Sequence, residues 1–313
     1  MTSEARRFAF VQLDVFTAKP LEGNQLAVFT DARGLSDQEM QALAKEMNLS
    51  ETTFILPGDP SVEARDGVRV RIFTVEEELD FAGHPTLGTA SVIRDRLFAP
   101  EGADMKRPAE VALALRVGRI PVTFSVDKQG KIFGEMLQRD PEFGPVHPRE
   151  EVARATGLAI DDIDPNFPIQ TVSTGLPFTI VPLRKAETLL QLHQKFSFST
   201  AAPYLKQASA GFLYFVTRDT AGLTGDAKGA RLESRMIFYN GEDPATGSAA
   251  GCCASWMVRH GVTKNDEQVM IAQGLRIHRP SYLHVRARLE GEKVTGVRVG
   301  GNTAEVLRGE VTL

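Results

Sequence analysis

Hydrophobic and polar residues alternate in several short stretches of the chain, which is the pattern of strands with one buried face. The clearest case is Val68, Val70 and Ile72, which alternate with arginines. One helix has an explicit start signal, because Ser36-Asp-Gln-Glu39 is a capping box and predicts a helix to about Met47. The apolar pattern predicts further strands at residues 8–15, 25–30, 51–56, 110–117, 120–126, 172–182 and 211–216.

The C-terminal stretch from Ser281 to Leu313 also alternates, with glycines between its segments, and predicts a meander of strands. A helical pattern is confined to a few segments, one of them at about 148–157. The glycine signatures of dinucleotide and phosphate-loop binding do not occur. Because short strands dominate and do not alternate regularly with helices, the pattern predicts an α+β fold rather than a doubly wound α/β fold.

A seven-residue pattern occurs twice, as His84-Pro-Thr-Leu-Gly-Thr-Ala90 and, 159 residues later, as Asp243-Pro-Ala-Thr-Gly-Ser-Ala249. Each copy has a polar residue, then a proline, then small residues, which predicts a helix with proline at its first position. The first turn of a helix presents unpaired N–H groups and a partial positive charge, so each start is a candidate anion site. The repetition predicts a duplicated fold that holds an acidic small molecule between its halves.

Both predicted helices are rich in small residues, and residues 245–255 contain only Ala, Thr, Gly, Ser and Cys. A helix without a polar, charged face has no solvent side, so each is expected to be a central helix wrapped by a curled sheet. Glycine in a helix costs roughly 1 kcal/mol relative to alanine, which indicates that other atoms approach closely there. Cys252 and Cys253 are interpreted as ordinary core residues of such a helix.

The 313 residues favour two domains of about 150 residues each. A net charge of −4 gives no general attraction to nucleic acid or to an anionic membrane. The N-terminus lacks the apolar core of a signal peptide and no apolar run is long enough to span a bilayer, so a cytoplasmic protein is expected. Two adjacent cysteines and six histidines without ligand spacing predict neither a disulfide nor a metal site.

Several longer motifs follow one another in a fixed order along the chain. They are Gly23-Asn24, Ser50-Glu-Thr-Thr-Phe54, Ala82-Gly-His-Pro85, Glu242-Asp-Pro-Ala-Thr-Gly-Ser248 and Gln273-Gly274. Together they resemble the PhzF family, the phenazine-biosynthesis isomerase and its relatives, from about residue 8 to the C-terminus. The resemblance implies the diaminopimelate-epimerase-like fold, with two similar domains and an active site in the cleft between them. It also implies an enzyme without a cofactor, acting on a small acidic substrate as a homodimer.

On this basis the first domain is expected at residues 1–120 and the second at 121–299. The resemblance also allows the last strand, at 300–313, to return to the first domain.

The resemblance places Glu51 at the family's general acid/base position. A glutamate can remove a carbon-bound proton and return it elsewhere if burial raises its pKa towards neutrality. His84 and Asp243 carry over as its partners, Asp243 holding the substrate amino or hydroxyl group and His84 exchanging a proton at the reacting face. Related epimerases use a cysteine in each half, and here His84 and Asp243 are expected at the corresponding helix starts.

The substrate carboxylate is assigned to Ser248 and to N–H groups near Gly247 and Gly88, with Asn24 as a further polar contact. One position departs from the family pattern, because His278 stands where the family often has glycine. This substitution affects the expected pocket more than the fold, and it is also consistent with a variant surface loop.

The predicted activity is that of an isomerase that moves a proton within a small carboxylate-bearing substrate such as a dihydro-hydroxyanthranilate. Two alternatives stay open. One is an epimerase or racemase of an amino or hydroxy acid, with Glu51 and either Asp243 or His84 as the two bases. The other is a non-catalytic protein that binds a small acid.

Overall fold

The computed structural model describes residues 5–97, 109–126, 130–238 and 241–313. Contacts divide the chain into two compact units: unit 1 contains residues 1–137 and 300–313, and unit 2 contains residues 138–299. The division falls after Leu137 rather than at 120, because the strands at 118–126 and 132–137 extend the sheet of unit 1. The C-terminal strand lies in unit 1 as well.

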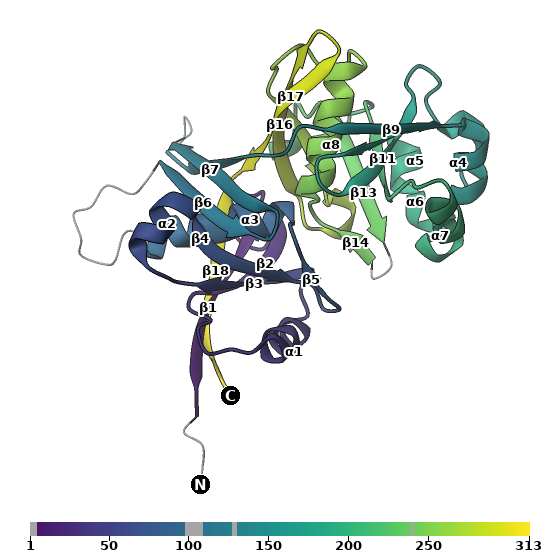
Figure 1. Ribbon diagram of the computed structural model, residues 1–313. Coiled ribbons are helices and arrows are strands. Elements are labelled where there is room, and N and C mark those ends of the chain that lie inside the picture. Colours follow the sequence, from purple (N-terminus) through teal and green to yellow (C-terminus); the bar gives the residue numbers. More distant parts are fainter. Residues whose placement is uncertain (1–4, 98–108, 127–129, 239–240) are drawn as a thin grey trace. The chain divides into compact units, whose positions relative to one another are not determined.

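Unit 1 is a mixed sheet with a helix packed inside its curve. Its strands follow the order β18–β1–β2–β3–β4–β6–β7–β8, with β2/β3 and β4/β6 parallel and the other pairs antiparallel. Figure 1 shows β18, from the end of the chain, beside β1. The elements are β1 (Arg7–Val15), β2 (Asn24–Phe29), α1 (Asp37–Met47), β3 (Glu51–Leu56), α2 (Pro60–Asp66), β4 (Val68–Phe73), β5 (Glu78–Leu79), α3 (Gly83–Val92), the π-helical turn η1 (Ile93–Leu97), β6 (Glu110–Leu115), β7 (Gly118–Val126), β8 (Ile132–Leu137) and β18 (Thr303–Thr312).

Unit 2 repeats this arrangement. Its strands follow the order β9–β10–β11–β12–β13–β15–β16, with β11/β12 and β13/β15 parallel and the other pairs antiparallel. The elements are β9 (Glu142–His147), α4 (Arg149–Thr156), η2 (Ile160–Asp162), β10 (Ile169–Ser173), β11 (Pro177–Leu183), α5 (Ala186–Leu190), α6 (Leu192–Lys195), α7 (Phe198–Gln207), β12 (Phe212–Thr217), η3 (Gly225–Ala227), β13 (Leu232–Phe238), β14 (Gly241–Asp243), α8 (Gly247–Arg259), β15 (Val269–Gln273), η4 (Leu275–Ile277), β16 (Ser281–Glu290) and β17 (Lys293–Gly301), which ends in unit 1.

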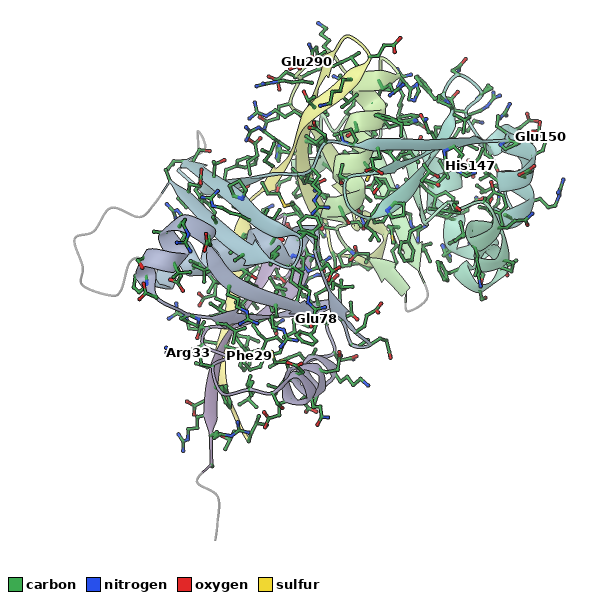
Figure 2. All side chains as sticks on the ribbon, in the orientation of Figure 1. Phe29, Arg33, Glu78, His147, Glu150 and Glu290 are labelled. Carbon is green, nitrogen blue, oxygen red and sulfur yellow. The ribbon has the colours of Figure 1, made fainter. Side chains whose placement is uncertain are left out.

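An arginine–glutamate pair fixes the same hairpin in each unit. In unit 1, Arg71 on β4 donates through Nε and Nη2 to both oxygens of Glu78 on β5, at 2.7 and 2.6 Å. Glu78 is labelled in Figure 2. In unit 2, Arg235 on β13 makes the same two-pronged contact with Glu242 on β14. Both residues of the second pair lie 164 positions after those of the first, so the structural repeat has an offset of 164 residues.

The expectation of enclosed central helices is confirmed. Every residue of α3 is buried, and so is every residue of α8 except Arg259. Strands β1, β2, β3, β6, β7 and β8 surround α3, while α8 lies against β10, β11 and β16 (Figure 1). The α+β assignment and the expected duplication, with a curled mixed sheet around a central helix in each half, therefore hold.

The predicted start of both central helices is wrong in detail. The helix α3 begins at Gly83 after the cap residue Ala82, so Pro85 is its third residue. The helix α8 begins at Gly247 after the cap residue Thr246, and Asp243 is the last residue of β14. The seven-residue likeness at an offset of 159 is thus five residues out of structural register, because pairing of the β4–β5 and β13–β14 hairpins sets the true correspondence.

Two other expectations have clear outcomes. The capping box is present, with Glu39 and Ser36 bonding each other's backbone N–H groups at the start of α1. The single strand expected at 172–182 is wrong, because Thr174–Leu176 turn the chain between β10 and β11. No helix among the described residues is long and apolar enough to cross a membrane.

Gly251, in the middle of α8, gives a stability prediction. A Cβ at this position would lie 1.8 Å from Oε1 of Gln138, whose amide donates to the Gly247 carbonyl at 3.0 Å and accepts from Thr174 at 2.9 Å. We expect Gly251→Ala to lower the free energy of unfolding by about 1–3 kcal/mol, because the Gln138 side chain must leave its site. Thermal unfolding followed by circular dichroism measures the effect.

Gly222 is the matched control in the same unit, since no atom beyond its two chain neighbours lies within 4 Å of the point that a Cβ on this residue would occupy. Gly222→Ala is expected to change stability by less than about 0.5 kcal/mol. Equal unfolding midpoints for the two variants would contradict the close packing of Gln138 against α8.

Candidate active site

The candidate acid/base pair lies in unit 1, where β3 and α3 start close together. Parallel pairing of β3 with β2 places Glu51 opposite Leu26, at the first position of the strand. His84 is the second residue of α3, and its Nε2 lies 3.5 Å from Oε2 of Glu51. The Glu51 side chain is 17% exposed and that of His84 only 4%. Glu51 and His84, predicted from the sequence to act together, are therefore neighbours.

His84 is held as a neutral ring. Burial lowers the pKa of its imidazole to about 3, and a backbone hydrogen bond with Gln25 opposes that effect only in part. Its Nδ1 lies 3.3 Å from the amide nitrogen of Asn24, a residue that is 1% exposed at the start of β2. Its Nε2 has no hydrogen-bond partner among the residues that the structure describes. A buried nitrogen in this state is suited to meet a polar group of a ligand.

The second set of predicted residues lies in unit 2, at the start of α8. Asp243 ends β14 and is 8% exposed, and its Oδ2 accepts a hydrogen bond from the Thr246 hydroxyl at 2.7 Å. Gly247 and Ser248 are the first two residues of α8, where backbone N–H groups have no partner within the helix. Backbone N–H groups at a helix start attract anionic groups such as carboxylates.

Gly88 differs from the other predicted binding residues. It is the sixth residue of α3, beyond the first turn, so its N–H belongs to the helix ladder. A Cβ there would lie 2.6 Å from Leu26 Cδ2 and 2.9 Å from Val15 Cγ2, so close packing against β1 and β2 requires glycine. The glycine at the helix start is Gly83. Together with His84, it matches Gly247 and Ser248 in unit 2, a correspondence that the motif likeness in the sequence does not reveal.

Cys252 and Cys253 are fully buried in α8, as the core interpretation predicts. Burial raises the pKa of the Cys252 thiol to about 11 and that of Cys253 further. Both thiols therefore stay protonated near neutral pH and neither resembles the thiolate base of a cysteine-dependent epimerase. Within the described residues, no three His, Cys, Asp or Glu side chains are grouped so that they could hold a metal ion.

His278 lies on an exposed loop and has a left-handed backbone conformation, with φ of 59°. This region favours glycine, which explains physically why a family member with glycine there fits the loop without strain. Gly274 at the start of the same loop is also left-handed, and a Cβ on it would lie 2.2 Å from the Arg279 carbonyl oxygen. In this chain the position keeps its left-handed backbone conformation and carries an imidazole ring.

Comparison with known proteins identifies first the fold and then the family. A hydroxyproline epimerase from Agrobacterium vitis is similar in structure, with a TM-score of 0.68 over 98% of this chain and 93% of that one. At 11% identity this likeness shows the diaminopimelate-epimerase-like fold alone.

A family model described as phenazine biosynthesis-like protein matches residues 13–309. The trans-2,3-dihydro-3-hydroxyanthranilate isomerase of Pseudomonas aeruginosa is 35% identical over 97% of this chain and 99% of its own. A PhzF-family phenazine biosynthesis protein from Bacillus anthracis has a TM-score of 0.81 at 25% identity, covering 98% of this chain and all of that one. The chain therefore belongs to the PhzF family, and the class of enzyme that these matches support is an isomerase.

The neutral state of His84 gives a prediction of pH dependence. Below about pH 6.5 an unfolded chain protonates this ring, whereas the folded protein does not until about pH 3. Protonation thus favours the unfolded state, and the stability contributed by this site falls as the pH drops through that window. We expect ¹⁵N NMR of the imidazole to show a neutral His84 throughout pH 5–8.

His84→Gln should correspondingly flatten the decline of the unfolding free energy between about pH 6 and pH 4. A His84 ring that becomes protonated between pH 8 and pH 5 would show that burial does not exclude the proton.

Proposed function

We propose that this protein is a cofactor-independent isomerase that shuttles a proton within a small carboxylate-bearing substrate, with Glu51 as the general acid/base. The observation that carries the proposal is the Glu51 carboxylate 3.5 Å from the buried Nε2 of His84, in a chain of the PhzF family. The substrate in the name of the Pseudomonas relatives, trans-2,3-dihydro-3-hydroxyanthranilate, is the first candidate for this chain.

The proposed step moves one proton and leaves the composition of the substrate unchanged. Glu51 takes a proton from one carbon, the C–H electron pair shifts a double bond, and Glu51 returns the proton to another carbon. Since the pKa of His84 is only about 3, its ring is a poor base and leaves the proton on the carboxyl group. The neutral ring can still hydrogen-bond to the reacting face while the proton moves.

The start of α8 supports an acidic substrate. Gly247 and Ser248 present N–H groups at the positive end of a buried thirteen-residue helix, and these groups suit a carboxylate. The carboxylate of Asp243 suits an amino or hydroxyl group of the same compound. That this set and the Glu51–His84 pair act on one substrate molecule remains the prediction made from the sequence, as do a homodimer and a cytoplasmic location.

The alternatives lose support unequally. An epimerase with His84 as its second base is disfavoured, because a ring with so low a pKa would have to carry the proton in one direction. An epimerase that pairs Glu51 with Asp243 keeps support from the buried carboxylate of Asp243. A non-catalytic binding protein is disfavoured by the presence of Glu51 beside His84, which anion binding alone does not require.

The proposal is tested by incubating the purified protein with trans-2,3-dihydro-3-hydroxyanthranilate in D₂O and following deuterium and product by NMR and mass spectrometry. We expect a relocated double bond with wild-type protein, and Glu51→Gln should lower the rate by about 10²–10⁴-fold with substrate affinity nearly unchanged. Glu46→Gln, which alters an exposed carboxylate on α1, should leave the rate unchanged.

Two results would overturn parts of the proposal. Turnover that survives in Glu51→Gln would exclude Glu51 as the base. Deuterium at a stereocentre with both hands recovered, and no relocated double bond, would favour the epimerase. If the wild type leaves this compound unchanged, the compound is not its substrate, and a deuterium-exchange screen of small amino and hydroxy acids follows.

A further inference from the structure

A chain of buried polar side chains in unit 2 leads to Asp243. It begins at Tyr214 on β12, which is fully buried, passes through Gln273 at the end of β15, and reaches Thr246 before α8. Tyr214 donates to Gln273 Oε1 at 2.9 Å, and Gln273 Nε2 donates to Thr246 Oγ1 at 2.9 Å. Thr246 then donates to Asp243 Oδ2 at 2.7 Å. Each of these side chains is at most 8% exposed.

Backbone groups fix the direction of every bond in this chain. Gln273 Oε1 accepts from the Thr246 N–H at 3.2 Å, and its Nε2 donates to the Asp243 carbonyl at 2.8 Å. Turning the amide over would set donor against donor and acceptor against acceptor. Because the Thr246 oxygen already accepts from the amide nitrogen, its single hydroxyl proton is directed to the Asp243 carboxylate.

The first donor of the chain keeps its proton. Burial is the largest cause that raises the pKa of Tyr214 well above its usual value; the charge of Asp243 adds to it, and a hydrogen bond with Ser234 opposes it. The thiols of Cys252 and Cys253 are protonated near neutral pH. The negative charge of Glu242, the neighbour of Asp243, is balanced by Arg235, which donates to both of its carboxylate oxygens.

The matching positions of unit 1 show whether a buried helix start requires such a chain of polar side chains. The strand registers and the 164-residue offset pair each member with a residue of unit 1. The counterparts of Tyr214, Asp243, Thr246 and Gln273 are Thr53, Leu79, Ala82 and Leu115. Three of these four counterparts are apolar, and the fourth, Thr53, pairs with Thr89. Unit 1 thus builds a buried helix start of the same kind without a polar chain that leads to it, and α8 needs no such chain for its own formation.

Thr246 is also not used as a helix cap. It occupies the cap position of α8, yet its side chain makes no capping hydrogen bond to the first turn. A threonine hydroxyl at this position ordinarily bonds the backbone N–H two or three residues on. Here the hydroxyl is instead committed to a carboxylate.

We propose that Thr246, with its hydroxyl oriented by Gln273, is a positioning residue that fixes the side-chain direction of Asp243 and favours its ionised form. Its role in the reaction rests on the proposed function, in which Asp243 contacts the substrate. Gln273 acts through its hydrogen bond to Thr246, and Tyr214 acts through its hydrogen bond to Gln273. The carboxylate and the hydroxyl occur together in unit 2 and are both absent from the matching positions of unit 1.

The test uses Thr246→Val, which keeps the shape of the side chain and removes the hydroxyl, with Thr246→Ser as the matched variant that keeps it. In protein labelled with ¹³C at the aspartate carboxyl carbon, Asp243→Asn assigns the Asp243 signal and a pH titration gives its pKa. We expect Thr246→Val to raise that pKa by about one unit, since a hydrogen bond to the charged form is lost. Thr246→Ser should stay within about 0.3 units of the wild type.

An unchanged Asp243 pKa in Thr246→Val, with a wild-type pattern of backbone amide signals, would overturn the proposal. Should Thr246→Val fail to fold, Gln273→Leu is the second variant, which introduces the residue found at the matching position of unit 1. It removes the amide that orients the Thr246 hydroxyl without adding a charge, and should raise the Asp243 pKa by about half a unit. Tyr214→Phe removes only the outermost donor, leaves the three other bonds of Gln273, and is expected to produce the smallest shift.

A kinetic measurement separates this proposal from the proposed function. If the isomerase activity is present, Thr246→Val should lower kcat by about tenfold, move the acid limb of the kcat–pH profile upward with the Asp243 pKa, and leave KM within about twofold. Thr246→Ser, which keeps the hydroxyl, should have the kcat, the pH profile and the KM of the wild type. If the wild type does not turn over trans-2,3-dihydro-3-hydroxyanthranilate, the assignment of that substrate fails, while the carboxyl titration still decides the role of Thr246.

Discussion

The enclosure of two helices within their own sheets is the constraint on which the rest of this structure depends. A helix that touches strands on nearly every side can carry neither a charged face nor many large side chains, and α3 and α8 are accordingly short of both. In α8, position 251 is a glycine, because the Gln138 side chain occupies the space that a Cβ would need. Enclosure also buries the helix starts, where unpaired N–H groups and a partial positive charge are strongest in effect.

Each unit uses its buried helix start differently, although the surrounding framework is the same. The two arginine–glutamate pairs hold equivalent hairpins in register. In both units the same number of residues separates the glutamate from the first residue of the central helix. In unit 1 the second helical residue is His84, beside Glu51, and burial holds its ring neutral. In unit 2 the second helical residue is Ser248, and the last strand residue before the helix is a carboxylate. One scaffold thus places a carboxylate beside a neutral imidazole in one copy, and a carboxylate just before a helix start in the other.

A buried polar group loses its hydrogen bonds to water, and the two units differ in how far the protein replaces them. Unit 2 satisfies its groups almost completely, because Gln273 alone makes contact with Tyr214, Thr246 and the Asp243 backbone. Unit 1 leaves Nε2 of His84 without a hydrogen-bond partner among the described residues. An unsatisfied buried nitrogen is unfavourable in the free protein and becomes favourable when a ligand supplies the missing group. The network in unit 2 is satisfied within the protein, whereas Nε2 of His84 in unit 1 is not.

The sequence by itself determined the α+β class, the enclosed helices and membership of the PhzF family, and it singled out Glu51 and His84 as the candidate acid/base pair. These features depend on local composition and on motifs of a few residues, which the chain displays directly. The tertiary structure alone decided the register of the duplication. The likeness between His84–Ala90 and Asp243–Ala249 suggested an offset of 159, whereas strand pairing sets 164 and makes Ser248 the counterpart of His84. Hydrogen bonding between distant strands, which no local pattern encodes, likewise brought Tyr214, Thr246 and Gln273 to Asp243, and packing against β1 and β2 explained Gly88.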